Sequence, residues 1–191
     1  MGEIAERFRR VAAGLTRTID EVPDDAWTQP SPCEGWNAID VVRHLTTWIP
    51  GPGFLLGTFG VATDEMPAVD DDPAGAWAAV RDAIQAGLDD PTIAGRVEDC
   101  GPPGHLSFEA AVDMTCIPDV LVHTWDLARA AGVEARLDPE EVARQAAGVA
   151  RVPPEMDLAM RASGHFGARV EVPSDADDLT RLLAFHGRRA G

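Results

Sequence analysis

The sequence predicts an all-α fold with at most one small β-hairpin. Apolar residues recur at steps of three and four along several segments, which is the period of a helix that buries one face. Two segments also begin with aspartate followed by proline, at 72–73 and 138–139, a pattern typical of a helix N-cap with proline at the first helical position. A chain of 191 residues is long enough to bury one core, so we expect a single domain over residues 1–191.

The first helix is indicated by a continuous apolar stripe near the N-terminus. The stripe consists of Ile4, Phe8, Val11, Leu15, Ile19 and Val22. The helix is expected to end before Pro23, which opens a turn signal. Residues 23–36 hold three prolines and a glycine, so they are expected to form a connector that packs on the body through its tryptophans.

The second helix is expected from Ala38 to about Ile49. Asn37 is its N-cap, and Asp40 stands in the first turn, where a carboxylate favours the positive end of the helix. One side of this helix is apolar, with Val41, Leu45 and Trp48. His44 lies on that same side, so its imidazole is expected to face inward.

The third helix is expected from Pro73 to Asp89. Its buried stripe consists of Trp77, Val80, Ile84 and Leu88. Before it, the prolines and glycines of residues 50–53 interrupt the second helix, which can resume over 54–59. Residues 60–71 are rich in acidic and small side chains and are expected to form a loop.

The fourth helix is expected over residues 108–131, ending at Gly132. Pro118 lies inside it and should either kink the helix or divide it at Ile117. Before it, Arg96–Asp99 and Leu106–Ser107 are the candidate strands of a short hairpin. Beyond it, shorter helices are expected over 139–149 and 155–162, then an extended segment over 164–173 and a final helix marked by Leu179, Leu182, Leu183 and Phe185.

Composition excludes several classes of partner. The net charge of −16 argues against nucleic acid and anionic membrane, because both attract basic surfaces. No apolar run approaches the roughly 20 residues that span a bilayer, and the N-terminus lacks the apolar core of a signal peptide. Three cysteines without metal-finger spacing indicate a reduced, cytoplasmic compartment.

The most informative stretch is residues 114–125, in which Asp119 and His123 are the only acidic or basic side chains besides the thiol of Cys116. Residues four apart on a helix lie on one face, with Cβ atoms roughly 5–6 Å apart, so this carboxylate and imidazole can converge on one ion. His44 would supply a third ligand. Two histidines and one carboxylate with an open position are typical of catalytic zinc, and the same set also suits iron or nickel. The alternatives are a buried Asp–His hydrogen bond and a histidine that is merely satisfied in the core.

Other side chains near this stretch have a more ordinary interpretation. Asp126 can accept the second ring N–H of His123, although it can also be a plain charge at the wetter end of the helix. Cys116 is expected to be a small buried hydrophobe, with a fourth metal ligand as the alternative, and Cys33 is expected to be structural. Trp36, Trp48 and Trp125 are expected in the core, and His105, His165 and His186 at the surface.

Two motifs resemble those of a known family. Residues 31–45, Ser-Pro-Cys-Glu-Gly-Trp-Asn-Ala-Ile-Asp-Val-Val-Arg-His-Leu, resemble the opening motif of actinobacterial metal-binding proteins related to mycothiol-dependent maleylpyruvate isomerase. Residues 119–128, Asp-Val-Leu-Val-His-Thr-Trp-Asp-Leu-Ala, are similar to the second motif. The segments 161–167 and 181–188 resemble one subgroup of that family. The resemblance therefore spans nearly the whole chain.

The resemblance implies a DinB-like four-helix bundle with helices in up-down-down-up order, and it implies that His44, Asp119 and His123 bind the metal. The isomerase has glutamate where this chain has Asp119, so the ligand helix must approach more closely here. Pro118 is not expected from the family. The isomerase also carries a separate C-terminal domain that contributes to its activity, and residues 150–191 are too short for it, so we do not transfer that reaction.

We therefore expect a metal-binding helical bundle with a thiol-dependent transferase or isomerase-like activity on an electrophile that the sequence does not indicate. Zinc is the expected ion, and the resemblance implies mycothiol as the thiol. The alternatives are a non-catalytic metal-binding protein, a dimeric interaction module and a bundle without metal. A homodimer is favoured by an apolar outer face of the fourth helix, formed by Ile117, Leu121 and Ala128.

Overall fold

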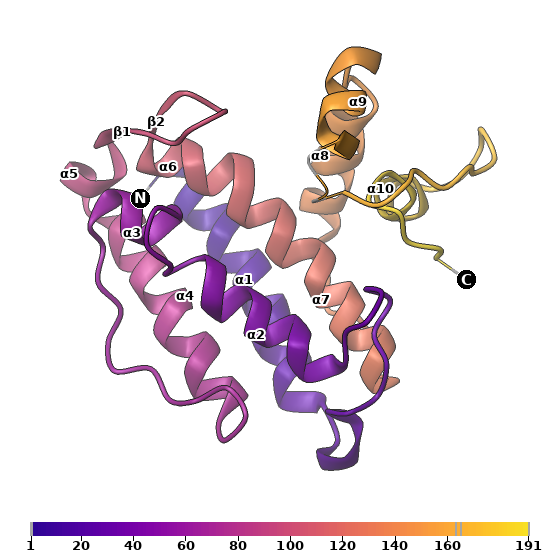
Figure 1. The fold of residues 1–191 in the computed structure, drawn as a ribbon, viewed down its shortest axis with the longest axis horizontal. Coiled ribbons are helices and arrows are strands. Elements are labelled where there is room, and N and C mark those ends of the chain that lie inside the picture. The colour runs from indigo at the N-terminus through magenta and orange to yellow at the C-terminus, as the bar shows by residue number, and fades with distance from the viewer. Residues whose placement is uncertain (1, 163, 165, 191) are drawn as a thin grey trace. The chain divides into compact units, whose positions relative to one another are not determined.

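Helices make up most of the residues that the structure describes, and they are accompanied by one small hairpin (Figure 1). The computed structural model describes residues 2–162, 164 and 166–190. The chain divides into two compact units, Met1–Leu137 and Asp138–Gly191. A single domain over residues 1–191 stays a prediction. Within the described ranges, no helix combines the length and the apolar character needed to cross a bilayer.

The elements follow the expected order, with short additions. The first unit contains α1 (Glu3–Glu21), a 3-10 turn (Asp24–Ala26), α2 (Ala38–Trp48), α3 (Leu55–Phe59), α4 (Pro73–Asp89), α5 (Pro91–Ala94), β1 (Val97–Asp99), β2 (His105–Ser107), α6 (Phe108–Ala111), a π-helical turn (Val112–Cys116) and α7 (Ile117–Ala131). The second unit contains α8 (Pro139–Val149), α9 (Pro154–Ala162) and α10 (Asp178–Phe185).

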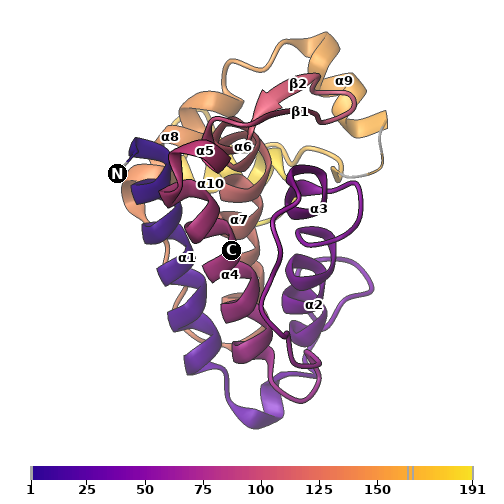
Figure 2. The ribbon, with the colours of Figure 1, turned by 90° about the vertical axis from the view of Figure 1, so that its left-hand side faces the viewer.

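Four helices build the core of the first unit. Helices α1 and α2 each pack against both α4 and α7. Figures 1 and 2 show that α1 and α7 run in one direction and that α2 and α4 run in the opposite one. The long connection over residues 60–72 returns the chain so that α4 starts at the same end as α2. The four helices contribute fully buried side chains such as Phe8, Leu15, Leu45, Trp77, Ile84 and Leu121, each worth about 1.5–3 kcal/mol on burial.

A capping box fixes the start of α2, as the sequence predicts. The Asn37 N–H donates to Asp40 Oδ2 at 2.9 Å, which satisfies a backbone group that has no partner within the helix. The Asp40 carboxylate also forms an ion pair with Arg43 one turn later. The helix that carries His44 is therefore held at its N-terminal end.

The helix predicted over residues 108–131 is divided, and α7 begins at Ile117, which is one of the two outcomes that Pro118 indicated. A π-helical turn over Val112–Cys116 separates α6 from α7, and the Ile117 N–H donates to the carbonyl of Val112. Pro118 lies in the first turn of α7. Proline removes a helical N–H and its ring collides with the preceding turn, and the wider π-helical turn gives that ring space.

The face that favoured a homodimer is not exposed. Ile117, Leu121 and Ala128 are buried in this chain. A homodimer therefore stays a prediction without the support that the sequence offered for it.

The region between α4 and α6 is more regular than expected. Asp90 and Pro91 end α4 but also begin α5, because the Asp90 carboxylate accepts a hydrogen bond from the Thr92 N–H at 2.8 Å. The predicted hairpin is confirmed, with β1 and β2 antiparallel and Glu98 opposite Leu106. His105 is exposed on β2, as predicted.

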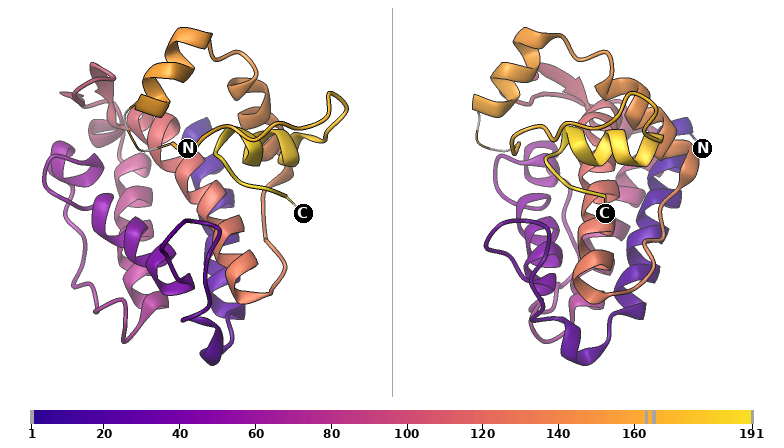
Figure 3. Two further views of the ribbon diagram at one scale, coloured as in Figure 1. Left: turned by 45° about the vertical axis from the view of Figure 1, so that its right-hand side comes forward. Right: turned by 90° about the vertical axis from the view of Figure 1, so that its right-hand side faces the viewer.

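The second unit is built on the contact between α8 and α10, which are coloured orange and yellow in Figure 3. Asp138 caps α8 as predicted, and Asp177 caps α10 in the same way. His186 lies in the turn after α10, as predicted, but it is half-buried, and its ring lies 5.4 Å from that of Phe185. His165 lies outside the described residues.

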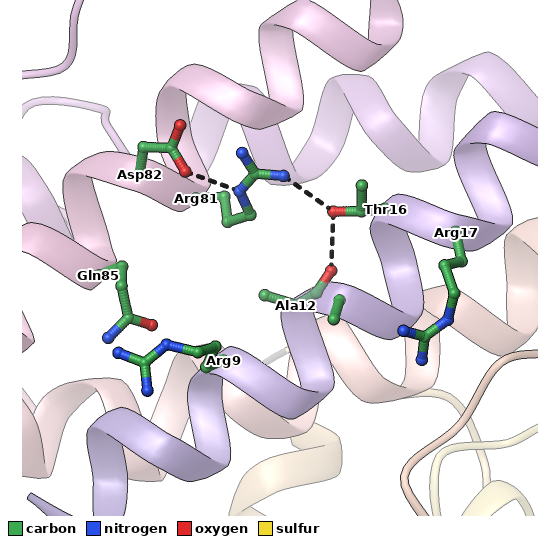
Figure 4. A pocket seen from close by; sticks show the side chains of 8 residues that line it. Arg9, Ala12, Thr16, Arg17, Arg81, Asp82 and Gln85 are labelled. Atoms are coloured by element: carbon green, nitrogen blue, oxygen red, sulfur yellow. Dashed lines mark hydrogen bonds and ion pairs between the residues drawn. The ribbon is translucent and has the colours of Figure 1, made fainter.

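A pocket lies between α1 and α4 (Figure 4). Thr16 Oγ1 accepts hydrogen bonds from Trp77 Nε1 at 3.0 Å and from Arg81 at 3.2 Å, and Arg9 forms an ion pair with Asp89 at 3.3 Å. These contacts join the two helices. None of the predicted metal ligands lines the pocket.

Candidate metal centre

The structure brings together the three predicted ligands from two helices. His44 lies near the end of α2, and Asp119 and His123 lie one turn apart on α7. His44 Nε2 is 3.1 Å from Asp119 Oδ2, and His123 Nε2 is 3.3 Å from Asp119 Oδ1. The two imidazole rings are 4.8 Å apart between centroids. The carboxylate therefore stands between the two histidines.

These distances fit a small divalent ion. Two ligand atoms on a tetrahedral zinc ion, each bonded at 2.0–2.1 Å, are separated by about 3.3 Å. The two separations are near that value, but His44 approaches Oδ2 and His123 approaches Oδ1, so an ion on one Asp119 oxygen would match only one of them. One ligand atom from each of the three residues lies within 4.8 Å of the other two. The donor set of two nitrogens and one oxygen suits zinc, nickel or iron. Whether an ion binds there stays a prediction.

The centre lies at the boundary between the core and the solvent. The side chains of His44 and Asp119 are 30% and 28% exposed, whereas that of His123 is only 7% exposed. His44, which was expected to face inward, is therefore only partly buried. A half-exposed carboxylate and imidazole leave room for water or a substrate to approach.

Two tryptophans that we expected in the core contact this centre instead. Trp48 is half-buried, and its Nε1–H donates to Asp119 Oδ2 at 2.9 Å. Trp36, from the connector before α2, is also half-buried, and its ring lies 5.1 Å from that of His44 and 5.8 Å from that of His123. Trp48 lies one turn after His44 in the sequence, and this spacing could have identified it as a neighbour of the candidate metal centre. Trp125 is buried, as predicted.

Asp119 and His123 each favour the charged form of the other. Burial opposes ionisation of Asp119, but the charge of His123 and hydrogen bonds from His123 and His44 outweigh it, so the pKa of Asp119 lies well below its usual range. Burial also disfavours a charged His123, yet the Asp119 carboxylate and the contacts with Asp126 and Cys33 raise the pKa of His123 well above its usual value. Both shifts favour the charged forms of Asp119 and His123.

Asp126 lies where the sequence placed it, behind His123. Its side chain is fully buried, and its Oδ2 is 3.0 Å from His123 Nδ1. That approach is off the line of a straight N–H···O hydrogen bond, so Nδ1 has no well-aligned acceptor. The carboxylate stands in the position of the partner that commonly orients a ligand histidine.

The structure gives each cysteine a specific environment. A structural role for Cys33 stays a prediction; its Sγ donates to Asp126 Oδ2 at 3.3 Å, on the Nδ1 side of His123. Cys116 is buried, as predicted, but it belongs to neither cluster of possible ligands among the described residues. The alternative of Cys116 as a fourth ligand therefore has no geometric support.

Comparison with known proteins finds one family and two relatives that resemble this chain. The family described as the mycothiol maleylpyruvate isomerase N-terminal domain matches residues 8–51, which include Cys33, Trp36 and His44. Two uncharacterized proteins of Mycobacterium tuberculosis, one from strain CDC 1551 and one from strain H37Rv, are each 30% identical over 185 residues, or 94% of this chain and 94% of the relative. No solved structure matches the chain significantly.

The buried thiol of Cys116 should resist alkylation. Burial, with a smaller contribution from the Asp119 charge, raises the pKa of Cys116 well above its usual value, so this group stays a neutral thiol as the pH rises through the range where cysteines ordinarily ionise. In native protein at mildly alkaline pH, iodoacetamide should modify Cys116 at least about tenfold more slowly than the half-buried Cys100, measured by peptide mass spectrometry. Denatured protein should show equal rates. Equal rates in native protein would contradict the packing around Cys116.

Proposed function

Because the chain belongs to the mycothiol maleylpyruvate isomerase N-terminal domain family, we propose that it is a divalent-metal-binding protein with a thiol-dependent transferase or isomerase-like activity. The observation that carries this proposal is the approach of His44, on α2, to Asp119 and His123, on α7. These three side chains would hold the ion. Zinc is the first choice, and nickel or iron fits the same donors.

The fold that accompanies this proposal is a DinB-like four-helix bundle. It is supported by the packing of α1 and α2 against α4 and α7. The helix directions in Figure 2 support the proposed up-down-down-up order, in which residues 60–72 would be the crossover. In this order α2 and α7 are neighbours, so ligands from distant parts of the sequence can meet.

The chemistry of the site depends on which residues hold the ligands in place. A bound divalent ion would lower the pKa of a coordinated thiol and so supply a thiolate at neutral pH. Trp48 fixes the Asp119 carboxylate through its Nε1–H, and the ring of Trp36 packs beside both histidines. The exposed sides of His44 and Asp119 leave a direction from which a thiol and an electrophile can approach.

The family name supplies the candidate thiol, which is mycothiol. We propose a small-molecule electrophile as the second substrate. We also propose a cytoplasmic location, since the three cysteines, all of which are described, form no disulfide. The net charge of −16 favours small-molecule substrates over nucleic acid or membrane surfaces.

A purely structural metal site is the second candidate. Such a site is normally closed by four protein ligands. Among the described residues, the cluster at His123 Nε2 has only three possible metal ligands, which are His44, Asp119 and His123 itself. Two of them are part-exposed. This arrangement favours an open site.

Metal content tests the ligand assignment. Protein purified without a chelator or a histidine tag should contain about one zinc, nickel or iron ion per chain by elemental analysis. Changing His44→Ala, Asp119→Ala or His123→Ala should remove the ion because each deletes one of three ligands. His105→Ala, an exposed histidine on β2, should leave the content unchanged. An ion retained in the His44→Ala protein would contradict the assignment.

Thiol-dependent turnover tests the activity separately. Metal-loaded protein should accelerate the reaction of mycothiol with members of a panel of model electrophiles, followed by loss of free thiol. The acceleration should vanish after chelation, return when the ion is restored, and be absent from the His44→Ala protein. If metal-loaded protein accelerates none of the reactions, the metal-binding part of the proposal can stand but the activity cannot.

A further inference from the structure

The far side of His123 carries a second cluster of possible ligands. Cys33, His123 and Asp126 offer a sulfur, a nitrogen and an oxygen that all lie within 4.8 Å of one another. Asp126 Oδ2 is 3.3 Å from Cys33 Sγ and 3.0 Å from His123 Nδ1. None of these atoms takes part in the His44–Asp119 cluster, because that cluster uses the opposite ring nitrogen, Nε2.

A separate observation favours a ligand at this cluster. His123 Nδ1 is a buried polar atom without a hydrogen bond of ordinary geometry, although the Asp126 carboxylate lies beside it. The Asp126 carboxylate is fully buried, where it lies beside the His123 ring and accepts a hydrogen bond from the Cys33 thiol.

The position of Cys33 is fixed although it lies in a connector. The Trp36 N–H donates to the Cys33 carbonyl at 3.0 Å, and Ser31 Oγ accepts from the Cys33 N–H at 3.1 Å. The Ala38 N–H donates to the Gln29 carbonyl at 2.9 Å, which anchors the connector at the start of α2. The thiol is therefore held against Asp126 by the backbone, and the residue is half-buried.

We propose that Cys33, His123 and Asp126 form a second cation site, which takes a thiophilic divalent ion such as Cd²⁺. A thiolate and a carboxylate together neutralise a divalent ion, and a sulfur ligand selects softer ions than the two histidines and one carboxylate of the other cluster. Binding releases the Cys33 proton to the solvent. The site does not depend on metal binding by His44 and Asp119.

The two clusters are alternatives because they share one imidazole. A neutral histidine offers one nitrogen lone pair, and its other nitrogen carries the proton. An ion on Nε2 leaves a proton on Nδ1, facing Asp126, whereas an ion on Nδ1 leaves a proton on Nε2, facing Asp119. The tautomer of His123 thus decides which cluster is filled, and a softer ion displaces a harder one.

Cadmium titration of the metal-free full-length chain tests this site. Adding Cd²⁺ should produce the ultraviolet sulfur-to-cadmium charge-transfer band, which saturates at about one ion per chain because the clusters exclude each other. Cys33→Ser should abolish the band, and Cys100→Ser, at another half-buried cysteine, should leave it intact. Circular dichroism of each variant should show unchanged helix content.

The His44→Ala protein separates this inference from the proposed function. It should keep the cadmium band at full amplitude, since His44 belongs only to the other cluster. A band that survives Cys33→Ser, or no band with unmodified protein, would overturn the second site. Two cadmium ions per chain would overturn the mutual exclusion. If zinc content is insensitive to His44 while the band still requires Cys33, the proposed function fails and the second site stands.

Discussion

The Asp119 carboxylate is the point on which the candidate site depends. It lies 3.1 Å and 3.3 Å from the Nε2 atoms of His44 and His123, and it accepts a hydrogen bond from Trp48 at 2.9 Å. A part-buried carboxylate needs such partners, because desolvation without them is unfavourable. The contact between α2 and α7 provides them. The same contact sets the distance between the three candidate ligands, so the packing of two helices defines the geometry of the site.

His123 joins two different environments. On its Nε2 side lie a carboxylate and an imidazole that are partly open to solvent. On its Nδ1 side lie Asp126, which is fully buried, and the thiol of Cys33. The two sides therefore differ in chemistry. The part-exposed side offers nitrogen and oxygen atoms, and the buried side adds the sulfur of Cys33. The ring also couples ligand binding on its two sides, because only one of its nitrogens carries the proton in the neutral form.

The sequence predicted the parts of the site that obey helical periodicity. The spacing of Asp119 and His123 requires a shared helix face, and the apolar stripe of α2 directs His44 inward. Cys33 was missed because it lies in an irregular connector, where side-chain direction depends on backbone hydrogen bonds that leave no periodic signal. The half-exposed position of Trp48 could not be predicted either, since aromatic residues on an apolar stripe are ordinarily buried.

The fold also combines features that the local sequence predicts with features that it does not. The cap at Asn37 and the stripes of α1 and α4 follow directly from local sequence, and these elements agree with the prediction within one or two residues. The π-helical turn before Pro118 was not foreseen, because a proline signals a disturbed helix but not the form of the disturbance. That turn lies directly before the ligand segment of α7.

The most direct test of the account is a crystal structure of the zinc-loaded chain with anomalous data at the metal edge. The account predicts an anomalous peak about 2.0–2.2 Å from His44 Nε2, an Asp119 oxygen and His123 Nε2, with at least one further position taken by water. A peak elsewhere in the molecule, or a His44 ring turned away from the ion, would contradict it.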